Sequence, residues 1–289
     1  MNCVYILRTL IEKYVGKKRG KLYVTSIDLQ KAFDRVDREV VFEKMYKWGV
    51  SKKIINAVKN IYKEVRCSIK IKGGQFIGDI TSEIGVKQGC KLSPILFLLV
   101  INDILEAVQE EMTPNLNNKE MKGLIFADDI LIFSQTPIGM QRNINKISEY
   151  CKKWGLGINK DKTKVLICKR GNKLSKYEKW YLDNEKIEVV RKMEYLGMIV
   201  NGNLSWGEHI KRAKLKGIAA LASLGIVEKR LPNVKFKIMR NIFNSMIKAK
   251  VLYGAEIWGV EKEKECLETI VNRCIKIIYG LPGTQPMGV

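Results

Sequence analysis

The sequence predicts an α+β fold, with an antiparallel sheet packed on helices over residues 1–200 and a helical region over 201–289. Two observations predict this. Up to about residue 200, short β-branched and apolar runs alternate with amphipathic helical patterns, whereas from residue 205 onward the apolar spacing is helical. The apolar runs 123–127 and 129–133 are also joined tightly enough to predict a β-hairpin. We therefore place a domain boundary near residue 200.

Five elements are expected before residue 85, in the order helix, strand, helix, helix and hairpin. They cover residues 3–15, 22–28, 33–50, 54–65 and 67–81. The strand ends at Asp28. Asp34 or Asp37 is the candidate N-cap of the second helix. Gly73 and Gly74 supply the permissive turn of the hairpin.

The middle of the chain is expected to continue from a flexible loop into one long helix that ends near residue 111. Ser93 is its candidate N-cap and Pro94 its first residue. After the hairpin at 123–133, a helix is expected whose Ile144, Ile147, Cys151 and Trp154 share one face. The remaining elements are a hairpin (156–159 with 164–170), a strand and turn (193–203) and helices (209–226, 234–258 and 266–280).

The composition indicates a polyanionic partner. The chain has 289 residues, 46% of them hydrophobic, so it can bury a substantial core. Its 52 Lys and Arg against 30 Asp and Glu give a formal net charge of +22, more than solubility requires. Because the basic residues are spread along the chain, nucleic acid is favoured over a membrane surface. A basic surface that is merely solvated is the alternative.

Cysteine usage and apolar runs indicate the compartment. The seven cysteines include no CxxC pair, which argues against a disulfide framework or a zinc site. The longest apolar run, residues 94–101, is too short to cross a bilayer, and the N-terminus lacks a secretory signal pattern. We expect a soluble intracellular protein with no membrane partner. The abrupt start and the ending LPGTQPMGV suggest a portion of a longer chain.

The adjacent carboxylates Asp128 and Asp129 lie between two apolar runs. There they repel each other, and one takes up a proton unless a positive charge holds both ionised. A divalent cation that prefers oxygen ligands, such as Mg²⁺, supplies that charge. The alternative is that the two aspartates are ordinary turn residues facing solvent.

A third carboxylate, Asp28, also ends an apolar strand. If that strand lies beside the 123–133 hairpin in one sheet, Asp28 and Asp128 converge at one edge. Two metal ions about 4 Å apart at such an edge activate an attacking hydroxyl and stabilise a leaving pyrophosphate. This is the chemistry of nucleic-acid polymerases.

Five segments carry a specific family resemblance in their order and approximate spacing: SIDLQKAFDRVDRE, GVKQGCKLSPILFLLVIND, FADDILIF, GLGINKDKTKVLI and EYLGMIV. They resemble the palm motifs of reverse transcriptases, and their wording is most similar to that of non-LTR (LINE-type) retrotransposons. The segments VLYGAEIWG and CIKIIYGLPGTQP resemble the region that follows the thumb in those polyproteins.

The resemblance implies a polymerase palm with only a remnant of the fingers over residues 1–200. Over 201–289 it implies a helical thumb and the start of the following region. The implied activity is that of an RNA-directed DNA polymerase, a nucleotidyltransferase that extends a DNA primer on an RNA template with deoxynucleoside triphosphates. The implied cofactors are two Mg²⁺ ions, for which Mn²⁺ is a substitute, and the implied location is the nucleus.

Carried over by position, the resemblance makes Asp28 and Asp128 ligands of both metals and Asp129 the third acidic member of the site. The backbone carbonyl of Leu29 is a further metal ligand. Lys162 matches a lysine near the departing pyrophosphate, where it is a candidate general acid. A solvated basic turn is the alternative for Lys162.

Five further residues match positions that contact substrate in the family. Phe33 falls at the steric-gate position, where an aromatic face crowds a 2′-hydroxyl; an ordinary core aromatic is the alternative. Gln88 and Gly89 match residues that line the nucleotide and template pocket. Phe126 and Ala127 match residues that flank the primer end.

The last part of the chain carries the implied primer and duplex contacts. Tyr195, Leu196 and Gly197 match the primer-grip turn, for which a plain strand end is the alternative. The helices after residue 205 fit a thumb that follows duplex phosphates. Its candidate nucleic-acid-binding residues are Lys211, Arg212, Lys214 and Lys216. For the single histidine, His209, we expect a surface or structural role.

The match fails in front of SIDL, because only residues 1–25 precede this segment. Most of the fingers region that holds the triphosphate is missing, as are an endonuclease domain and a Cys/His knuckle. Two alternatives therefore stay open: a catalytically inactive nucleic-acid-binding fragment or decayed element copy, and a group-II-intron-type maturase. An RNA-dependent RNA polymerase is disfavoured by Phe33.

Overall fold

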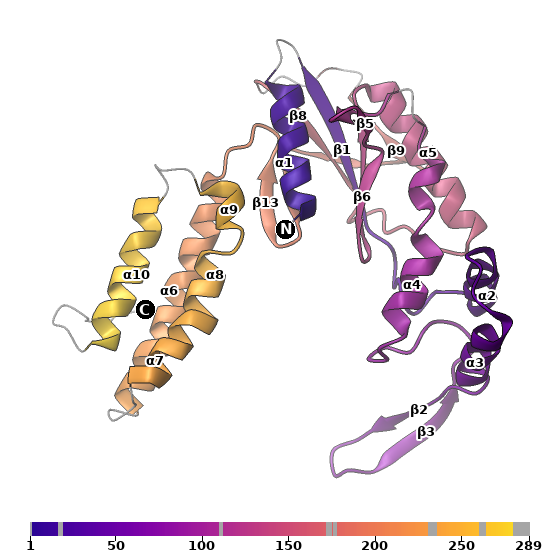
Figure 1. Ribbon diagram of the computed structural model, residues 1–289, viewed down its shortest axis with the longest axis horizontal. Coiled ribbons are helices and arrows are strands. Elements are labelled where there is room, and N and C mark those ends of the chain that lie inside the picture. Colours follow the sequence, from indigo (N-terminus) through magenta and orange to yellow (C-terminus); the bar gives the residue numbers. More distant parts are fainter. Residues whose placement is uncertain are drawn as a thin grey trace. The chain divides into compact units, whose positions relative to one another are not determined.

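The computed structural model describes residues 2–16, 20–109, 112–171, 175, 178–230, 236–259 and 264–279. The chain forms two compact units. One is Lys13–Arg191, and the other joins Met1–Glu12 to Lys192–Val289. Helices and strands are mixed in the first unit and helices predominate in the second, so the expected α+β class is confirmed (Figure 1). The assignment of palm and thumb to residues 1–200 and 201–289 stays a prediction.

The Lys13–Arg191 unit is built on a five-stranded sheet in the order β11-β8-β1-β7-β6. The central strand β1 (Lys21–Ile27) pairs antiparallel with β7 (Asp129–Ser134) on one side and with β8 (Lys164–Lys169) on the other. β6 (Gly123–Phe126) pairs antiparallel with β7, and β11 (Glu188–Val190) pairs parallel with β8. The apolar side chains of β1, β7 and β8 are buried.

Helices cover the sheet and form one hydrophobic core with it. Helix α5 (Pro137–Lys153) contacts β1 and β7, and α2 (Arg38–Lys47) contacts α3 (Lys52–Tyr62) and α4 (Ser93–Ile101). The predicted face of α5 is confirmed: Ile144, Ile147, Cys151 and the following Trp154 are all buried in this core.

The remaining elements of this unit are short. The hairpin of β2 (Arg66–Lys70) and β3 (Phe76–Thr81) confirms the predicted turn, since Gly73 and Gly74 both have positive φ. The others are η1 (Ile104–Ala107), β4 (Asn115–Leu116), β5 (Lys119–Glu120), β9 (Tyr181–Leu182) and β10 (Glu185–Lys186).

The second unit contains a hairpin and helices. Residues 2–12 of α1 (Asn2–Val15), the predicted first helix, belong to it. The hairpin pairs β12 (Lys192–Tyr195) with β13 (Met198–Asn201). The helices are α6 (Gly207–Arg230), α7 (Phe236–Ile242), the π-helical η2 (Phe243–Lys248), α8 (Ala249–Val251), α9 (Ala255–Trp258) and α10 (Lys264–Ile278).

Two predicted helix boundaries are wrong. The helix expected over 33–50 spans Arg38–Lys47. Of its two candidate N-caps Asp37 is confirmed, because its side chain accepts the Glu39 amide at 2.9 Å. The side chain of Asp34 instead accepts the Gln88 amide. The long helix expected to residue 111 ends at Ile101 and is followed by the separate turn η1; residues 110–111 lie outside the described residues.

The predicted role of Ser93 as N-cap is also wrong. The N-cap is Leu92, and the buried Ser93 hydroxyl donates to the carbonyl of Lys87 at 2.6 Å, which ties the preceding loop to the helix start. The helix expected over 234–258 is interrupted by the π-helical segment and by Gly254, whose φ is 72°. Residues 234–235 lie outside the described residues.

The hairpin predicted from residues 156–159 and 164–170 does not form. Both edges of β8 are occupied, by β1 and β11, so no edge is left for residues 156–159. Ile158 instead makes an isolated antiparallel bridge with Leu29, directly after β1. None of the helices in the described ranges combines the length and the apolar character needed to cross a membrane.

Candidate active site

The sheet register and the adjoining hairpin turn bring the three predicted carboxylates to one end of the sheet. β1 and β7 pair up to Ile27 and Ile130, so one further antiparallel step places Asp28 opposite Asp129. In the neighbouring hairpin Phe126 pairs with Asp129 and leaves Ala127 and Asp128 as the two turn residues. All three aspartates therefore lie at the same end of adjacent strands, although a hundred residues separate Asp28 from the other two.

The turn that carries Asp128 has an unusual backbone. Ala127 has φ of 52°, whereas Asp128 is not among the positive-φ residues. One positive φ followed by a negative one is the pattern of a type II′ hairpin turn, which normally has glycine at the first position. A side chain in this conformation costs about 1–2 kcal/mol, and such residues cluster at functional sites.

The charges of the three aspartates act on one another. The pKa of Asp129 is raised, first by burial and then by the negative charges of Asp128 and Asp28. A cation already stands nearby, because the Nζ atom of Lys162 lies 3.8 Å from Asp28 Oδ2. Lys162 is 69% exposed and Asp28 36%, so this pair is open to solvent. The structure thus brings the predicted Lys162 to the aspartates.

A short segment that the sequence reading had placed in a hairpin holds the Asp28 backbone. The Asn159 amide donates to the Asp28 carbonyl and the Gln30 amide donates to the Gly157 carbonyl, both at 2.7 Å. In an antiparallel ladder successive residues direct their polar groups to opposite sides. The carbonyl of Leu29 therefore points away from this segment, to the side of β7. Gly157 is the one sequence signal of this close approach, because a Cβ at this position would lie 2.4 Å from Arg35 Nη1.

The donor chemistry of this end of the sheet fits a divalent cation. Carboxylate and carbonyl oxygens are the ligands that Mg²⁺ prefers, and a dication relieves the repulsion that raises the pKa of Asp129. Among the described residues, no group of three or more His, Cys, Asp or Glu side chains is already drawn together closely enough to hold an ion. The backbone register therefore carries the assignment of this site, and the predicted metal ligands stay predictions.

Neutralising Asp129 is expected to stabilise the protein in the absence of a divalent cation. Its raised pKa means that ionisation is less favourable in the folded chain than in the unfolded one, so the stability contribution of this group decreases as pH rises through the folded-state pKa. Urea unfolding at pH 7 in EDTA checks this: Asp129→Asn has the higher free energy of unfolding, and Mg²⁺ reduces the difference. If Asp129→Asn had a lower free energy of unfolding than the wild type in EDTA, repulsion of Asp129 by Asp128 and Asp28 would not destabilise the fold.

The predicted nucleotide-pocket residues gather at a second place in the same unit. The ring of Phe33 lies 5.1 Å from that of Phe97, and the carbonyl of Phe33 accepts the amide of Val86 at 2.9 Å. Gln88 Nε2 donates to Asp34 Oδ1 at 2.7 Å. The approach of this loop requires Gly85, because a Cβ there would lie 2.7 Å from the Asp34 carbonyl oxygen.

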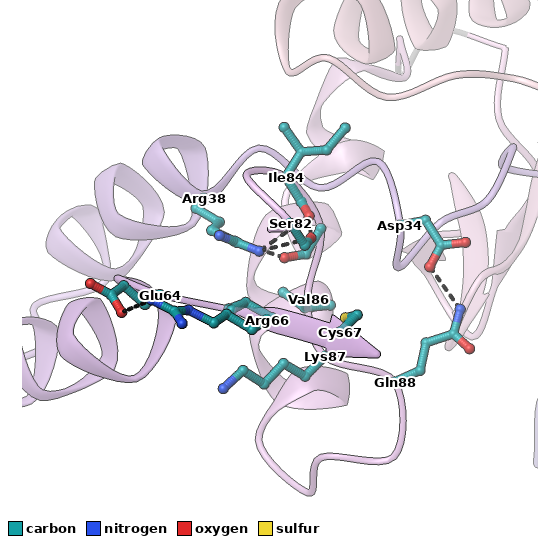
Figure 2. A pocket seen from close by; sticks show the side chains of 12 residues that line it. Asp34, Arg38, Glu64, Arg66, Cys67, Ser82, Ile84, Val86, Lys87 and Gln88 are labelled. Carbon is teal, nitrogen blue, oxygen red and sulfur yellow. Dashed lines mark hydrogen bonds and ion pairs between the residues drawn. The ribbon is translucent and has the colours of Figure 1, made fainter. Parts of the chain in front are cut away.

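A cavity of about 860 Å³ opens beside this loop (Figure 2). Its lining includes the cations Arg38, Arg66 and Lys87 together with the predicted Gln88. Figure 2 shows Arg38 directed at the segment before Gln88; its guanidinium donates to the carbonyls of Gly85, Ile84 and Tyr62 and to the Ser82 hydroxyl, at 2.9 to 3.3 Å. Sequence reasoning missed Arg38, which looked like an ordinary residue of an amphipathic helix.

The predicted primer-grip residues lie in the other unit. Tyr195 and Met198 end a tight hairpin whose turn residues, Leu196 and Gly197, have φ of 47° and 77°. Two consecutive positive φ values are the pattern of a type I′ turn. Leu196 and Gly197 thus form a hairpin turn, and Tyr195 is the last residue of β12. Their role as a primer grip stays a prediction.

The predicted nucleic-acid-binding residues lie on the first turns of α6. Lys211 and Lys216 are exposed and Lys214 is half-buried, whereas Arg212 Nη1 donates to Glu194 at 2.6 Å. Their contact with nucleic acid stays a prediction. His209 is buried, and its Nδ1 accepts the Ile199 amide at 3.3 Å, so its role in this unit is structural.

Comparison with known proteins places this arrangement in context. Residues 4–200 match the family model described as "Reverse transcriptase (RNA-dependent DNA polymerase)". A Pol polyprotein of the retrotransposable element R2DM of Drosophila melanogaster is 29% identical over 53% of this chain and 14% of its own length. An R2 polyprotein of Popillia japonica is 25% identical over 94% of this chain and 45% of its length. The probable RNA-directed DNA polymerase from transposon BS of Drosophila melanogaster is 24% identical over 89% and 29%, respectively.

The chain therefore spans less than half the length of each of these relatives. Among solved structures, apo telomerase from Candida tropicalis resembles it with a TM-score of 0.53 and 15% identity, over 98% of this chain and 51% of that one. This similarity supports the fold alone. The family match and the retrotransposon relatives confirm the resemblance seen in the five sequence segments.

Proposed function

Because the chain belongs to the reverse transcriptase (RNA-dependent DNA polymerase) family, we propose that it is the polymerase portion of a non-LTR retrotransposon polyprotein. It extends the 3′-hydroxyl of a DNA primer along an RNA template with deoxynucleoside triphosphates. The observation that carries this proposal is the sheet register, which sets Asp28 opposite Asp129 with Asp128 in the adjoining turn.

The three aspartates and the Leu29 carbonyl are the groups that would hold two Mg²⁺ ions, with Mn²⁺ as a substitute. When bound, the metals supply charge stabilisation for the attacking 3′-oxygen and for the leaving pyrophosphate. Asp28 and Asp128 hold these charges at the sheet end, and Asp129 adds a third carboxylate. Lys162, 3.8 Å from Asp28, is placed to give a proton to the departing pyrophosphate or to neutralise it.

Nucleotide and template contacts are assigned to the second cluster of the same unit. Phe33 presents an aromatic ring that crowds a 2′-hydroxyl, while Gln88 and Gly89 line the nucleotide. The adjoining cavity is lined by three cations, Arg38, Arg66 and Lys87, and by two carboxylates, Asp34 and Glu64. Because Arg66 pairs with Glu64, Lys87 is the cation that we assign to a phosphate of the nucleic-acid strand. Phe126, which is exposed at the end of β6, and Ala127 flank the primer end.

Primer extension tests the proposal. With a labelled DNA primer annealed to RNA, the chain incorporates deoxynucleotides in Mg²⁺ and stops when EDTA removes the metal. The same assay is run with an added fingers segment, because the family resemblance implies that this region holds the triphosphate. Binding of primer–template with a steep salt dependence, but no incorporation under either condition, would favour the alternative of a nucleic-acid-binding portion without turnover.

The steric-gate role of Phe33 makes a separate prediction. In Phe33→Val the aromatic face is lost, so ribonucleotides compete better and the preference for deoxynucleotides falls by about 10-fold or more, which corresponds to roughly 1.4 kcal/mol. Single-nucleotide incorporation of dCTP and CTP on the same primer–template measures the ratio. The control is Phe76→Val, at an exposed position on β3, which leaves the ratio unchanged. An unaltered ratio in an active Phe33→Val enzyme would make Phe33 an ordinary core aromatic.

A further inference from the structure

The segment Tyr253-Gly-Ala-Glu-Ile-Trp258 makes a specific contact with the turn between β12 and β13. The hydroxyl of Tyr253 donates to the carbonyl of Leu196 at 2.8 Å, across 57 residues of sequence. Both residues belong to the unit that contains Lys192–Val289. The matched family model ends at residue 200, so Tyr253 lies outside it.

The turn is held from a second direction by helix α6. Arg212 Nη2 donates to the carbonyl of Gly197, and Nη1 pairs with Glu194 on β12. The carbonyls of both turn residues therefore have a side-chain donor, one from Tyr253 and one from Arg212. Gly197 also permits a close approach, because a Cβ there would lie 3.3 Å from Cε1 of the Tyr253 ring.

Tyr253 is itself anchored by a buried residue. Trp258 is fully buried, and its Nε1 donates to the carbonyl of Tyr253 at 2.9 Å. Between them Gly254, with φ of 72°, is the N-cap of α9, a conformation that favours glycine. The rings of Trp258 and His209 lie 5.8 Å apart, and His209 accepts the amide of Ile199 on β13. Trp258 thus holds the backbone carbonyl of Tyr253, and the hydroxyl of Tyr253 holds the carbonyl of Leu196 in the hairpin turn.

We propose that Tyr253 is a positioning residue that sets the orientation of the turn formed by Leu196 and Gly197. This inference rests on the proposed function, in which that turn contacts the primer end. The tyrosine ring is 43% exposed, so packing alone does not hold it as it holds Trp258. Its hydroxyl is the group that selects one orientation of the Leu196 peptide. A small displacement of a primer terminus slows the transfer step more than it weakens binding.

The test uses Tyr253→Phe, which removes the hydroxyl and keeps the ring. The matched control is Tyr46→Phe on α2, where the tyrosine is 77% exposed. We expect the maximal rate of single-nucleotide extension to fall about 5- to 10-fold, the effect of losing one hydrogen bond of roughly 1 kcal/mol. The KM for the nucleotide stays within two-fold, since the nucleotide contacts lie elsewhere. Tyr46→Phe changes neither quantity.

A second readout, amide hydrogen exchange of the free protein, does not depend on activity. Peptides covering Lys192–Asn201 are expected to exchange several-fold faster in Tyr253→Phe than in the wild type. If these peptides exchanged at the wild-type rate, the hydrogen bond from Tyr253 to Leu196 would not orient the turn, and the proposal would be overturned. Faster exchange with an unchanged extension rate and KM would overturn its role in primer positioning.

Failure of the proposed function itself is distinguishable from failure of this inference. If the wild-type chain extends no primer, a photoreactive base at the primer 3′-end is crosslinked to the bound protein. Crosslinks to Lys192–Asn201 that fall several-fold in Tyr253→Phe and not in Tyr46→Phe support the positioning role without turnover. Crosslinks of equal yield in the wild type and Tyr253→Phe overturn it.

Discussion

Replacing Asp128 by asparagine is expected to lower the rate of primer extension by on the order of 10³-fold, because the side chain keeps its shape and loses its charge. In the proposed function this carboxylate is one ligand of the metals. Their charge stabilisation is worth several kcal/mol, and about 4 kcal/mol corresponds to this factor. Primer–template affinity stays within about two-fold, since basic residues and not Asp128 supply it. Single-turnover extension and a filter-binding titration measure the two quantities.

Asp161→Asn is the matched control, because Asp161 is an exposed aspartate in the same unit, beside Lys162. It is expected to extend primers at the wild-type rate. If Asp128→Asn retained more than a tenth of the wild-type rate, the assignment of catalytic metals to the β6–β7 turn would be wrong. If Asp128→Asn lost primer–template binding together with activity, the fold would be damaged. Extension by Asp128→Asn would then be measured again at a lower temperature, at which the variant binds primer–template.

Replacing Lys44 by methionine is expected to destabilise the protein by about 3 kcal/mol. This is the lower end of the cost of breaking a buried ion pair, because Lys44 is buried but the side chain of Asp103 is 26% exposed. Lys44 is 1% exposed and its Nζ lies 2.6 and 2.5 Å from the two carboxylate oxygens of Asp103. The same Nζ lies 4.0 Å from the centroid of the Trp154 ring and donates to the Tyr150 hydroxyl at 3.2 Å. Methionine leaves Asp103 without its cation.

Urea unfolding followed by circular dichroism measures this loss. Lys53→Met, at an exposed position on α3, is the control and changes stability by less than about 0.5 kcal/mol. The double variant Lys44→Met/Asp103→Leu recovers most of the loss, because no unpaired charge remains, and Tyr150 still has the carbonyl of Val100 at 2.8 Å. A single variant as stable as the wild type would show that the pair contributes nothing.

The same pair predicts a dependence on acid. Burial acts to raise the pKa of Asp103, but the hydrogen bonds from Lys44 and Tyr150 outweigh it and hold the pKa below its usual value. The contribution of this carboxylate is therefore fully present above the unfolded-state pKa of about 3.9 and is lost as pH falls through the lower folded-state value. The double variant lacks this carboxylate. The free energy of unfolding of the wild type therefore decreases relative to that of the double variant as pH falls over that range, and urea unfolding at several pH values measures this.

Much of the candidate site was predictable because its signals are local in the sequence. A strand that ends at Asp28 and a tight apolar hairpin that carries Asp128 and Asp129 are visible as short patterns, and both elements are confirmed. Their adjacency was a hypothesis that only the pairing of β1 with β7 supports. The turn at Leu196 and Gly197 was also located, through its match to the primer-grip turn of the family.

One error and two omissions share a physical cause: the decisive partners lie far away in the sequence. Residues 156–159 resemble half of a hairpin, but their partner is Leu29, because β8 is already paired on both edges. Lys44 reads as a solvent-facing lysine on an amphipathic helix, and only Asp103, 59 residues on, explains its burial. The contact of Tyr253 with Leu196 spans a similar distance and left no local pattern.

Iron-directed cleavage tests the central claim most directly, namely that Asp28 and the Asp128–Asp129 pair share divalent metal at one end of the sheet. Fe²⁺ is bound in place of Mg²⁺, and peroxide with ascorbate then generates radicals that cut the backbone close to the ion. The account predicts cuts both near Asp28 and near Asp128, which excess Mg²⁺ suppresses and which disappear together in Asp128→Asn. Cuts at only one of the two segments, or cuts that persist in Asp128→Asn, would contradict it.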